Sequence, residues 1–329
     1  MTDKSKIRAR SGWRRLGLLV FGSLLFAAYL ARLDWAAVGS SWMYFPGAVA
    51  AGVILLNLFT GALKYGRWSM LLRTRSITAR GRPFEEYMAI NAGFFLGLVT
   101  PGTSGELARG AFSDVAGSRA VAIVGFEKIC DFGILLLMVA GSAVVQFTSG
   151  LTSWLVSALI AIITLGAYLT FLRFDRFVTA PLSWLLGKIG SERHVEAARG
   201  VYWEFYELLK DRRSLVYSAG FSFLLWSLPV VQMHMILNGL DNGVPLKTSA
   251  FVFLFPYLVG ILSMIPAGIG AFDIAAHQLG GRAISLAGAT GEIGSFAPLY
   301  FRLLVTVPLI VLGYASQLWL NARKKSAVS

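Results

Sequence analysis

Long apolar runs separated by short polar stretches dominate this chain of 329 residues. Six of the runs approach the length of about 20 residues that a helix needs to cross a bilayer. We therefore expect six full membrane crossings, at Leu16–Ala31, Met43–Leu63, Val121–Phe147, Trp154–Leu172, Leu215–Leu237 and Phe296–Leu320. Leu16–Ala31 follows six basic residues, as a signal peptide would, but no small-residue cleavage site precedes Arg32, so we interpret it as a retained helix.

Two further apolar segments, Tyr87–Phe112 and Phe251–Ala289, are interrupted by proline and glycine. Proline inside a helix removes a backbone donor and clashes with the preceding turn. Irregular backbone within a membrane is tolerated only where protein or a water-filled cavity surrounds it, and paired breaks in two halves indicate a transporter binding site. The breaks, expected at 97–109 and 263–273, contain Pro101, Gly102, Gly105, Pro266, Gly268 and Gly270.

The composition and the charge agree with an integral membrane protein. Hydrophobic residues make up 56% of the chain and charged residues 14%, and the mean hydropathy is +0.65. The net charge of +13 raises nucleic acid as a partner, but the basic residues cluster beside apolar runs instead of forming a stripe with aromatics. We therefore interpret the charge as that of cytoplasmic loops and predict no nucleic-acid partner.

The positive-inside rule decides how the broken segments run. If both return to the side from which they entered, four segments lie in the cytoplasm: the N-terminus, Lys64–Arg82, Arg173–Arg213 and Arg323–Lys325. These segments hold 6, 6, 8 and 3 basic residues, whereas the outer loops hold only Arg32, Lys247 and Arg282. The sequence thus predicts two re-entrant helical hairpins, with both termini cytoplasmic, in a multi-pass protein of the cell (inner) membrane.

These hairpins would enter from opposite faces, which makes the two halves of the chain inverted relative to each other. The expected fold is an all-α helical bundle in a single transmembrane domain, with a first half at about 10–172 and a second at about 214–320. A cytoplasmic amphipathic connector at about 174–213 joins them. Inverted halves place a substrate near the bilayer midplane, although two proline-glycine breaks can also arise by chance in a glycine-rich chain.

Charged residues within the apolar runs are the candidate site, because an ionisable group inside a membrane is costly. The acids are Glu106, Glu127, Asp131 and Asp273, and the bases that can pair with them are Arg109, Lys128 and Arg302. Glu127 and Asp131 share a helix face, as a proton- or cation-coupling pair would. The alternative is that Lys128 and Arg302 neutralise these two acids in structural ion pairs.

Glu106 and Asp273 follow the breaks, where an acid either caps a helix N-terminus or faces a ligand. Arg302 and Arg109 are the candidates to bind a lipid phosphate. His277 is interpreted as a polar partner within its hairpin, and His234 has no acid or histidine at ligand spacing, so we expect no metal and no cofactor. Cys130, the single cysteine, is expected to be a packed side chain.

The run from Asn91 to Glu106, with Arg109, resembles the first signature of the lysylphosphatidylglycerol synthase transmembrane domain family of flippase-like proteins. Other segments agree with that resemblance: Arg67 and Trp68 after the second helix, Glu127, Lys128 and Asp131, the run from Ser263 to Asp273, and Tyr300 to Gly313. Asp273 and Lys128 depart from the family, where glutamate and arginine are commoner. We expect no soluble aminoacyl-transferase domain of the kind that the bifunctional synthases carry, so aminoacylation of a lipid is not implied.

The resemblance implies movement of a lipid between leaflets, with a phospholipid, an aminoacylated phospholipid, a hopanoid or a glycolipid intermediate as cargo, and it adds Arg67 to the substrate contacts. No Walker A motif is present, so the carrier would be passive or ion-coupled. We expect no enzymatic activity. The alternatives are a membrane enzyme that uses Glu106, Glu127 and Asp131 as acid and base, and a scaffold for a lipid synthase or glycosyltransferase partner.

Arg302→Ala is expected to abolish lipid movement without unfolding the protein, because the guanidinium is the main phosphate contact in this interpretation. Translocation of a labelled lipid in liposomes measures the effect. Wild-type rates in that variant would remove Arg302 from the binding site.

Overall fold

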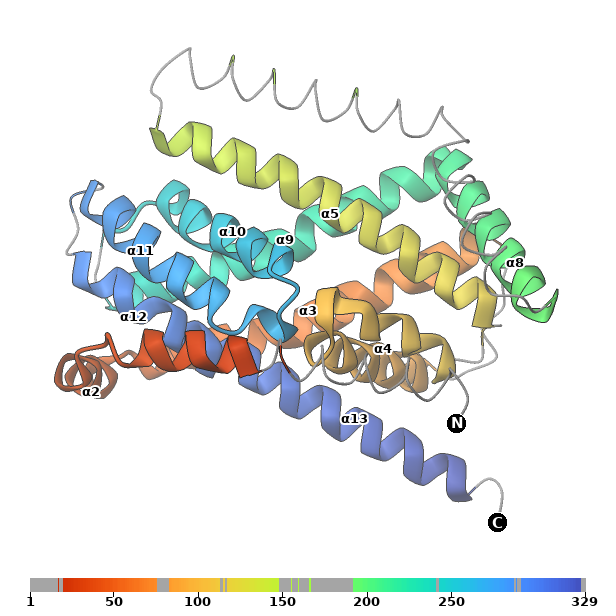
Figure 1. The fold of residues 1–329 in the computed structure, drawn as a ribbon, viewed down its shortest axis with the longest axis horizontal. Helices are drawn as coiled ribbons and strands as arrows, with labels where there is room; N and C mark the ends of the chain where they lie inside the picture. Colours follow the sequence, from red (N-terminus) through yellow and green to blue (C-terminus); the bar gives the residue numbers. More distant parts are fainter. Residues whose placement is uncertain are drawn as a thin grey trace. The chain divides into compact units, whose positions relative to one another are not determined.

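The computed structural model describes residues 20–75, 83–112, 117–147, 192–240, 243–286 and 291–326, together with Gly17, Val115, Leu155, Leu159, Gly166 and Gly288. These residues form helices and turns, and no strand occurs among them (Figure 1). The predicted all-α fold is confirmed. The predicted crossing at Trp154–Leu172, apart from Leu155, Leu159 and Gly166, and the first part of the predicted connector lie outside the described residues.

The helices begin and end as follows. They are Val20–Leu30, α2 (Trp35–Tyr44), α3 (Gly47–Thr74), α4 (Pro83–Leu98), the 3₁₀ helix η1 (Pro101–Ala111), α5 (Gly117–Phe147), α8 (Glu192–Lys210), α9 (Arg212–Leu240), α10 (Leu246–Leu262), η2 (Pro266–Gly268), α11 (Ala271–Leu286), α12 (Gly291–Phe301), the π-helical turn η3 (Arg302–Thr306) and α13 (Val307–Ser326).

Four of the described helices are long and apolar enough to cross a membrane: α3, α5, α9 and the continuous Ser295–Arg323. A fifth crossing is available if Val20–Leu30 and α2, which meet at 81°, are counted as one span. The chain is thus a multi-pass membrane protein. The expectation that the second helix ends at Leu63 was wrong, because α3 continues to Thr74 and carries Arg67 and Trp68 within it.

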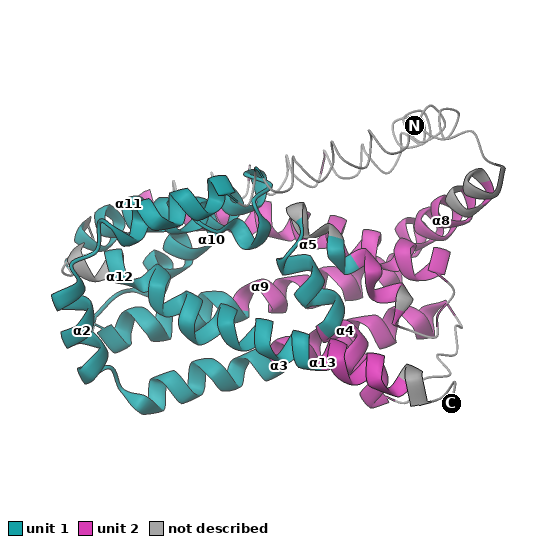
Figure 2. Cartoon of the chain, turned by 60° about the horizontal axis from the view of Figure 1, so that its bottom comes forward, with its two compact units in different colours: residues 1–58, 92–106, 228–315 teal, residues 59–91, 107–227, 316–329 magenta. Residues whose placement is uncertain are grey.

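The chain divides into two compact units (Figure 2). Unit 1 contains residues 1–58, 92–106 and 228–315, and unit 2 contains residues 59–91, 107–227 and 316–329. Unit 1 therefore holds the second predicted break, after α10, and residues 97–106 of the first, after α4, whereas residues 107–109 belong to unit 2. Each unit takes residues from both predicted halves, and the inverted relation between the halves stays a prediction.

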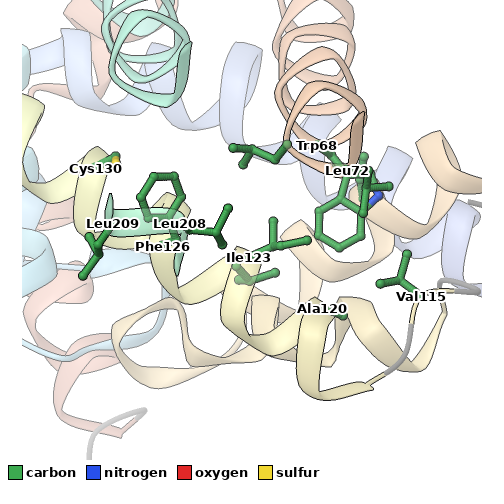
Figure 3. Packing of buried hydrophobic residues seen from close by; sticks show 12 residues of the cluster. Trp68, Leu72, Val115, Ala120, Ile123, Phe126, Cys130, Leu208 and Leu209 are labelled. Atoms are coloured by element: carbon green, nitrogen blue, oxygen red, sulfur yellow. The ribbon is translucent and has the colours of Figure 1, made fainter. Parts of the chain in front are cut away.

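The core of unit 2 forms where α8 packs against α5 (Figure 3). Trp68 from α3, Phe126 from α5 and Leu208 from α8 are buried together in it. Cys130 is buried in the same cluster. Residues of α3 beyond the predicted helix end thus supply part of this core, and this burial accounts for the extra turns of α3.

Polar contacts hold α8 in place and cap the helix that follows it. Glu204 accepts a hydrogen bond from Arg119 Nε at 2.8 Å and forms an ion pair with Arg75 at 3.4 Å. Asp211 then caps α9, because its carboxylate accepts hydrogen bonds from the Ser214 hydroxyl and from the Ser214 and Arg213 amides. These bonds, above all that from the Ser214 hydroxyl, hold the pKa of Asp211 below its ordinary value.

In unit 1, α11 packs against both α10 and α12. Phe253, Phe272 and Phe301 come from these three helices and lie with ring centroids 5.1 to 6.2 Å apart. The helix Val20–Leu30 lies against the turn before α11 through glycines on both sides. A Cβ at Gly22 would lie 2.5 Å from Ile265 Cγ2, and one at Gly270 would lie 2.6 Å from the Gly22 carbonyl oxygen.

Gly270→Ala is expected to lower the free energy of unfolding by about 1–3 kcal/mol more than Gly288→Ala does, because only Gly270 is crowded. The two glycines have nearly the same backbone conformation, with φ of +82° and +84°, but a Cβ at Gly288 would meet nothing within 4 Å. Unfolding of purified variants in mixed detergent micelles measures the difference. Equal losses would mean that left-handed strain, and not the contact with Val20–Leu30, decides the cost.

Candidate functional site

The second break is a tight turn of eight residues that reverses the chain between α10 and α11. Met264 and Ala267 have left-handed φ values of 56° and 51°, which are strained for residues with a Cβ, and Gly268 and Gly270 are also left-handed. The Ser263 hydroxyl donates to the Gly260 carbonyl at 2.6 Å and accepts from the Ile265 amide at 3.2 Å. It thereby satisfies backbone groups that the end of α10 frees.

Asp273, whose side chain is fully buried, connects this turn to the last long helix. Its Oδ2 accepts a hydrogen bond from the Gly270 amide at 2.8 Å, so the acid caps α11 as the sequence suggested. The same carboxylate receives the Arg302 guanidinium, with Nε 3.0 Å from Oδ1 and Nη2 3.1 Å from Oδ2. Asp273 is therefore a cap and an ion-pair partner at once.

Arg302 completes the turn by binding its carbonyl oxygens. Nη1 donates to Ala267 at 2.9 Å and Nη2 to Gly268 at 3.3 Å, while the guanidinium carbon lies 5.0 Å from the ring centre of Phe272. One side chain thus holds the strained residues in place and balances the buried charge of Asp273. Arg302 was predicted to bind phosphate, and in this state its donors contact the protein.

Arg302 also begins the π-helical turn η3, a feature the sequence did not reveal. Wider turns of this kind free backbone groups and often occur at functional sites. Asn57 Nδ2 donates to the Leu304 carbonyl at 3.1 Å, and Gln232 Nε2 donates to Asn57 Oδ1 at 3.0 Å and to the Val53 carbonyl at 2.9 Å. The signal available in the sequence was two amides within apolar helices, where polar side chains usually bind a partner.

The first break uses a hydroxyl in a similar way. After α4, the Thr100 hydroxyl donates to the Leu96 carbonyl at 2.7 Å and accepts from the Gly105 amide at 2.6 Å. A Cβ at Gly105 would lie 2.1 Å from the Leu96 oxygen, so only glycine fits there. Glu106 is buried, and its Cγ lies 2.7 Å from where a Cβ of Gly97 would be. Pro101 and Gly102 begin η1.

Four charges meet in unit 2. Glu127 of α5 lies between two arginines, with Oε2 3.1 Å from Arg109 Nη1 and Oε1 3.3 Å from Arg67 Nε. Arg67 in turn makes a two-pronged contact with Asp131, in which Nη1 donates to Oδ1 and Nη2 to Oδ2. Arg67, Arg109 and Glu127 are each 1% exposed, and Asp131 is 16% exposed. We call these four residues the charge network.

Neighbouring groups fix the orientation of the charge network. Ser222 of α9 donates to Asp131 Oδ1 at 2.7 Å, and Trp226 Nε1 donates to the Asp131 carbonyl at 2.9 Å. Arg109 lies over the ring of Trp68 at 5.0 Å, and Trp68 Nε1 donates to Glu86 at 3.0 Å. Two positive and two negative groups therefore compensate one another inside otherwise apolar helices.

The structure thus unites Arg67, Arg109, Glu127 and Asp131 and, separately, Asp273 and Arg302. The expectation that Arg302 neutralises Glu127 and Asp131 differs from the pairs observed, in which Arg67 and Arg109 contact these acids. Lys128 lies half-buried on α5. His277 packs edge-on against Tyr29, and His234 shares a hydrogen bond with Ser249. Among the described residues, no three His, Cys, Asp or Glu side chains gather as a metal site.

Comparison with known proteins identifies the family. The family model described as "Lysylphosphatidylglycerol synthase TM region" matches residues 15–313. The chain belongs to this family. The match covers both breaks, the charge network and Arg302, so the resemblance found in the sequence is confirmed over nearly its whole predicted extent.

One curated relative adds to this result. A "UPF0104 membrane protein" of Methanothermobacter thermautotrophicus (strain Delta H) is 27% identical over 283 residues, which cover 78% of this chain and 82% of the relative. The similarity to a protein named as a membrane protein agrees with the apolar helices of this chain. The relative's name states no substrate.

Arg302→Met is expected to lower the free energy of unfolding by about 3–5 kcal/mol, because it leaves the buried Asp273 carboxylate without its cation. This changes the expectation drawn from the sequence for Arg302→Ala, since the structure gives Arg302 a structural role. Adding Asp273→Asn should restore part of the loss, which denaturation in mixed detergent micelles measures.

Arg323→Met is the matched control, because the pair of Arg323 with Glu85 is partly exposed, and it should cost less than about 1 kcal/mol. If the losses of Arg302→Met and Asp273→Asn simply add in the double variant, the two side chains do not stabilise each other.

Proposed function

We propose that this chain moves a lipid with a phosphate-containing headgroup between the two leaflets of its membrane, without changing the lipid chemically. The charge network carries the proposal. It places four ionisable groups inside α3, η1 and α5, and two of these helices are apolar enough to cross a bilayer. Buried ion pairs contribute little net stability compared with apolar packing, so a membrane protein that holds four such charges uses them for function.

The arrangement suggests how a phosphate would bind. Glu127 contacts both Arg67 and Arg109, and a phosphate has the same charge sign and matches the same guanidinium geometry. In the proposed cycle the headgroup phosphate replaces the Glu127 carboxylate on the two arginines. Asp131 keeps its contact with Arg67 and Ser222 and so holds that arginine in place during the exchange.

The same exchange gives the acids a part in coupling. A carboxylate displaced from its arginines loses its cationic partners, and a buried charge without a partner is costly, so a coupling cation would take their place. Uptake of a cation by Glu127 would then accompany phosphate binding. The two breaks of unit 1 supply the re-entrant backbone of the proposed inverted halves, which open alternately to the two leaflets.

Arg109→Lys is expected to slow movement of phosphatidylglycerol about tenfold, because an ammonium keeps the charge but loses the planar fork, and one charge-assisted hydrogen bond is worth about 1.5–3 kcal/mol. The measurement is bleaching of headgroup-labelled phosphatidylglycerol by a membrane-impermeant reductant in liposomes with purified protein. Arg119→Lys is the matched control, since this arginine also pairs with a glutamate but is half exposed.

Glu127→Gln tests the exchange itself. Without the competing carboxylate, the half-saturating lipid concentration should fall while the maximal rate also falls. Wild-type behaviour in both variants would make the charge network purely structural. Movement of a neutral glycolipid but not of phosphatidylglycerol would refute a phosphate-containing cargo. A chemically altered lipid would indicate an enzyme. A lipid that neither moves nor changes chemically would indicate a scaffold.

A further inference from the structure

The short helix α2 of unit 1 turns sharply away from the helix that precedes it. It is ten residues long, or about 15 Å, half of the roughly 30 Å of hydrocarbon in a bilayer. It meets the helix Val20–Leu30 at 81° (Figure 1). If Val20–Leu30 runs through the membrane, α2 therefore lies nearly parallel to the membrane plane.

Four side chains of α2 are large, mainly apolar and exposed. Trp35 is 54% exposed, Trp42 47%, Met43 82% and Tyr44 84%. Val38 is the one buried residue of this helix. Tryptophan and tyrosine are enriched at the boundary of headgroups and acyl chains, where the ring is in an apolar layer and its polar atom reaches water. The charged residues Arg32 and Asp34 stand just before the helix, and Asp34 caps it.

Within unit 1, the residues that flank α2 lie near the start of α12 and near the end of α9. Tyr29, which precedes α2, donates to the Ser295 carbonyl near the start of α12 at 3.0 Å. Phe45, which follows α2, lies 2.8 Å from where a Cβ of Gly239 would be, near the end of α9. A place where one apolar helix begins and another ends is a place where the chain meets a membrane surface.

Contacts with Tyr300 hold α2 in this place. The Ser41 and Tyr300 hydroxyls lie 2.9 Å apart, and the rings of Trp42 and Phe45 each lie 5.0 Å from that of Tyr300. Tyr300 stands two residues before Arg302, the residue that closes the second break. Tyr300 thus holds α2 in place through these contacts, and it is close in the chain to the residue that stabilises the second break.

We propose that α2 is an in-plane interfacial helix whose exposed aromatic face is seated at the boundary of headgroups and acyl chains in one leaflet. Its occupant is the lipid surface of the membrane that the chain crosses. The direct connection to an apolar helix, the aromatic residues and the adjacent charges favour lipid over a second copy of the chain. This inference does not rest on lipid transport. It would connect the second break to one leaflet through Tyr300 and α2.

Spin labels on single cysteines test this position. Cys130→Ser removes the one native cysteine, and labels at Ala36, Ser40, Met43 and Tyr44 then report depth in liposomes from their collisions with oxygen and with a water-soluble nickel complex. Labels at Ile54, Leu55 and Leu58, which are exposed along α3, are the matched control in a spanning helix.

The α2 labels are expected to read one shallow depth near the headgroups, with no trend along the helix beyond its own periodicity. The α3 labels should change in depth by up to about 1.5 Å per residue. A steady change of depth along α2 would make it part of a bent span. High access to nickel at all four positions would place it in water, and low access to both reagents with spin–spin broadening would place a second copy on it; each overturns the proposal.

Discussion

Interrupted helices within a membrane leave backbone groups that water cannot satisfy, and the structure of unit 1 depends on how the second break meets this constraint. Arg302 satisfies most of these groups, because its guanidinium binds two carbonyl oxygens of the turn and the carboxylate of Asp273. Asp273 in turn caps α11. Without these contacts nothing would stabilise the left-handed conformation of Ala267 and the orientation of the neighbouring carbonyl groups. Such backbone strain is kept only where the surrounding structure imposes it.

The same constraint explains features that are otherwise unrelated. The Thr100 hydroxyl binds a backbone amide of the first break, and the Ser263 hydroxyl does so in the second. In the π-helical turn that begins at Arg302, the Asn57 amide binds the Leu304 carbonyl, and Gln232 holds Asn57 in place. In unit 2 the charges are compensated in pairs within the charge network. Most of the polar groups described in these sites thus have a partner from another turn or helix, which is what a low-dielectric surrounding favours.

The sequence predicted the membrane class, the family, the places of both breaks and the acids beside them, because proline, glycine and isolated charges in apolar runs are strong local signals. It missed the extent of α3, since Lys64 and Arg67 resemble loop charges until their burial within unit 2 is known. It also missed the partners of each charge. Arg67 and Asp131 are far apart in the chain, so their contact follows from helix packing, which residue spacing within one helix does not encode.

The central claim is that the charge network is an exchangeable phosphate site and not a permanent set of ion pairs. The most direct measurement is an experimental structure of the purified chain in lipid nanodiscs, once with phosphatidylglycerol and once with neutral lipid alone. We expect headgroup phosphate between Arg67 and Arg109 in the first, with the Glu127 carboxylate withdrawn from both, and the ion pairs described here in the second. A phosphate bound elsewhere, with Glu127 still contacting both arginines, would contradict the account.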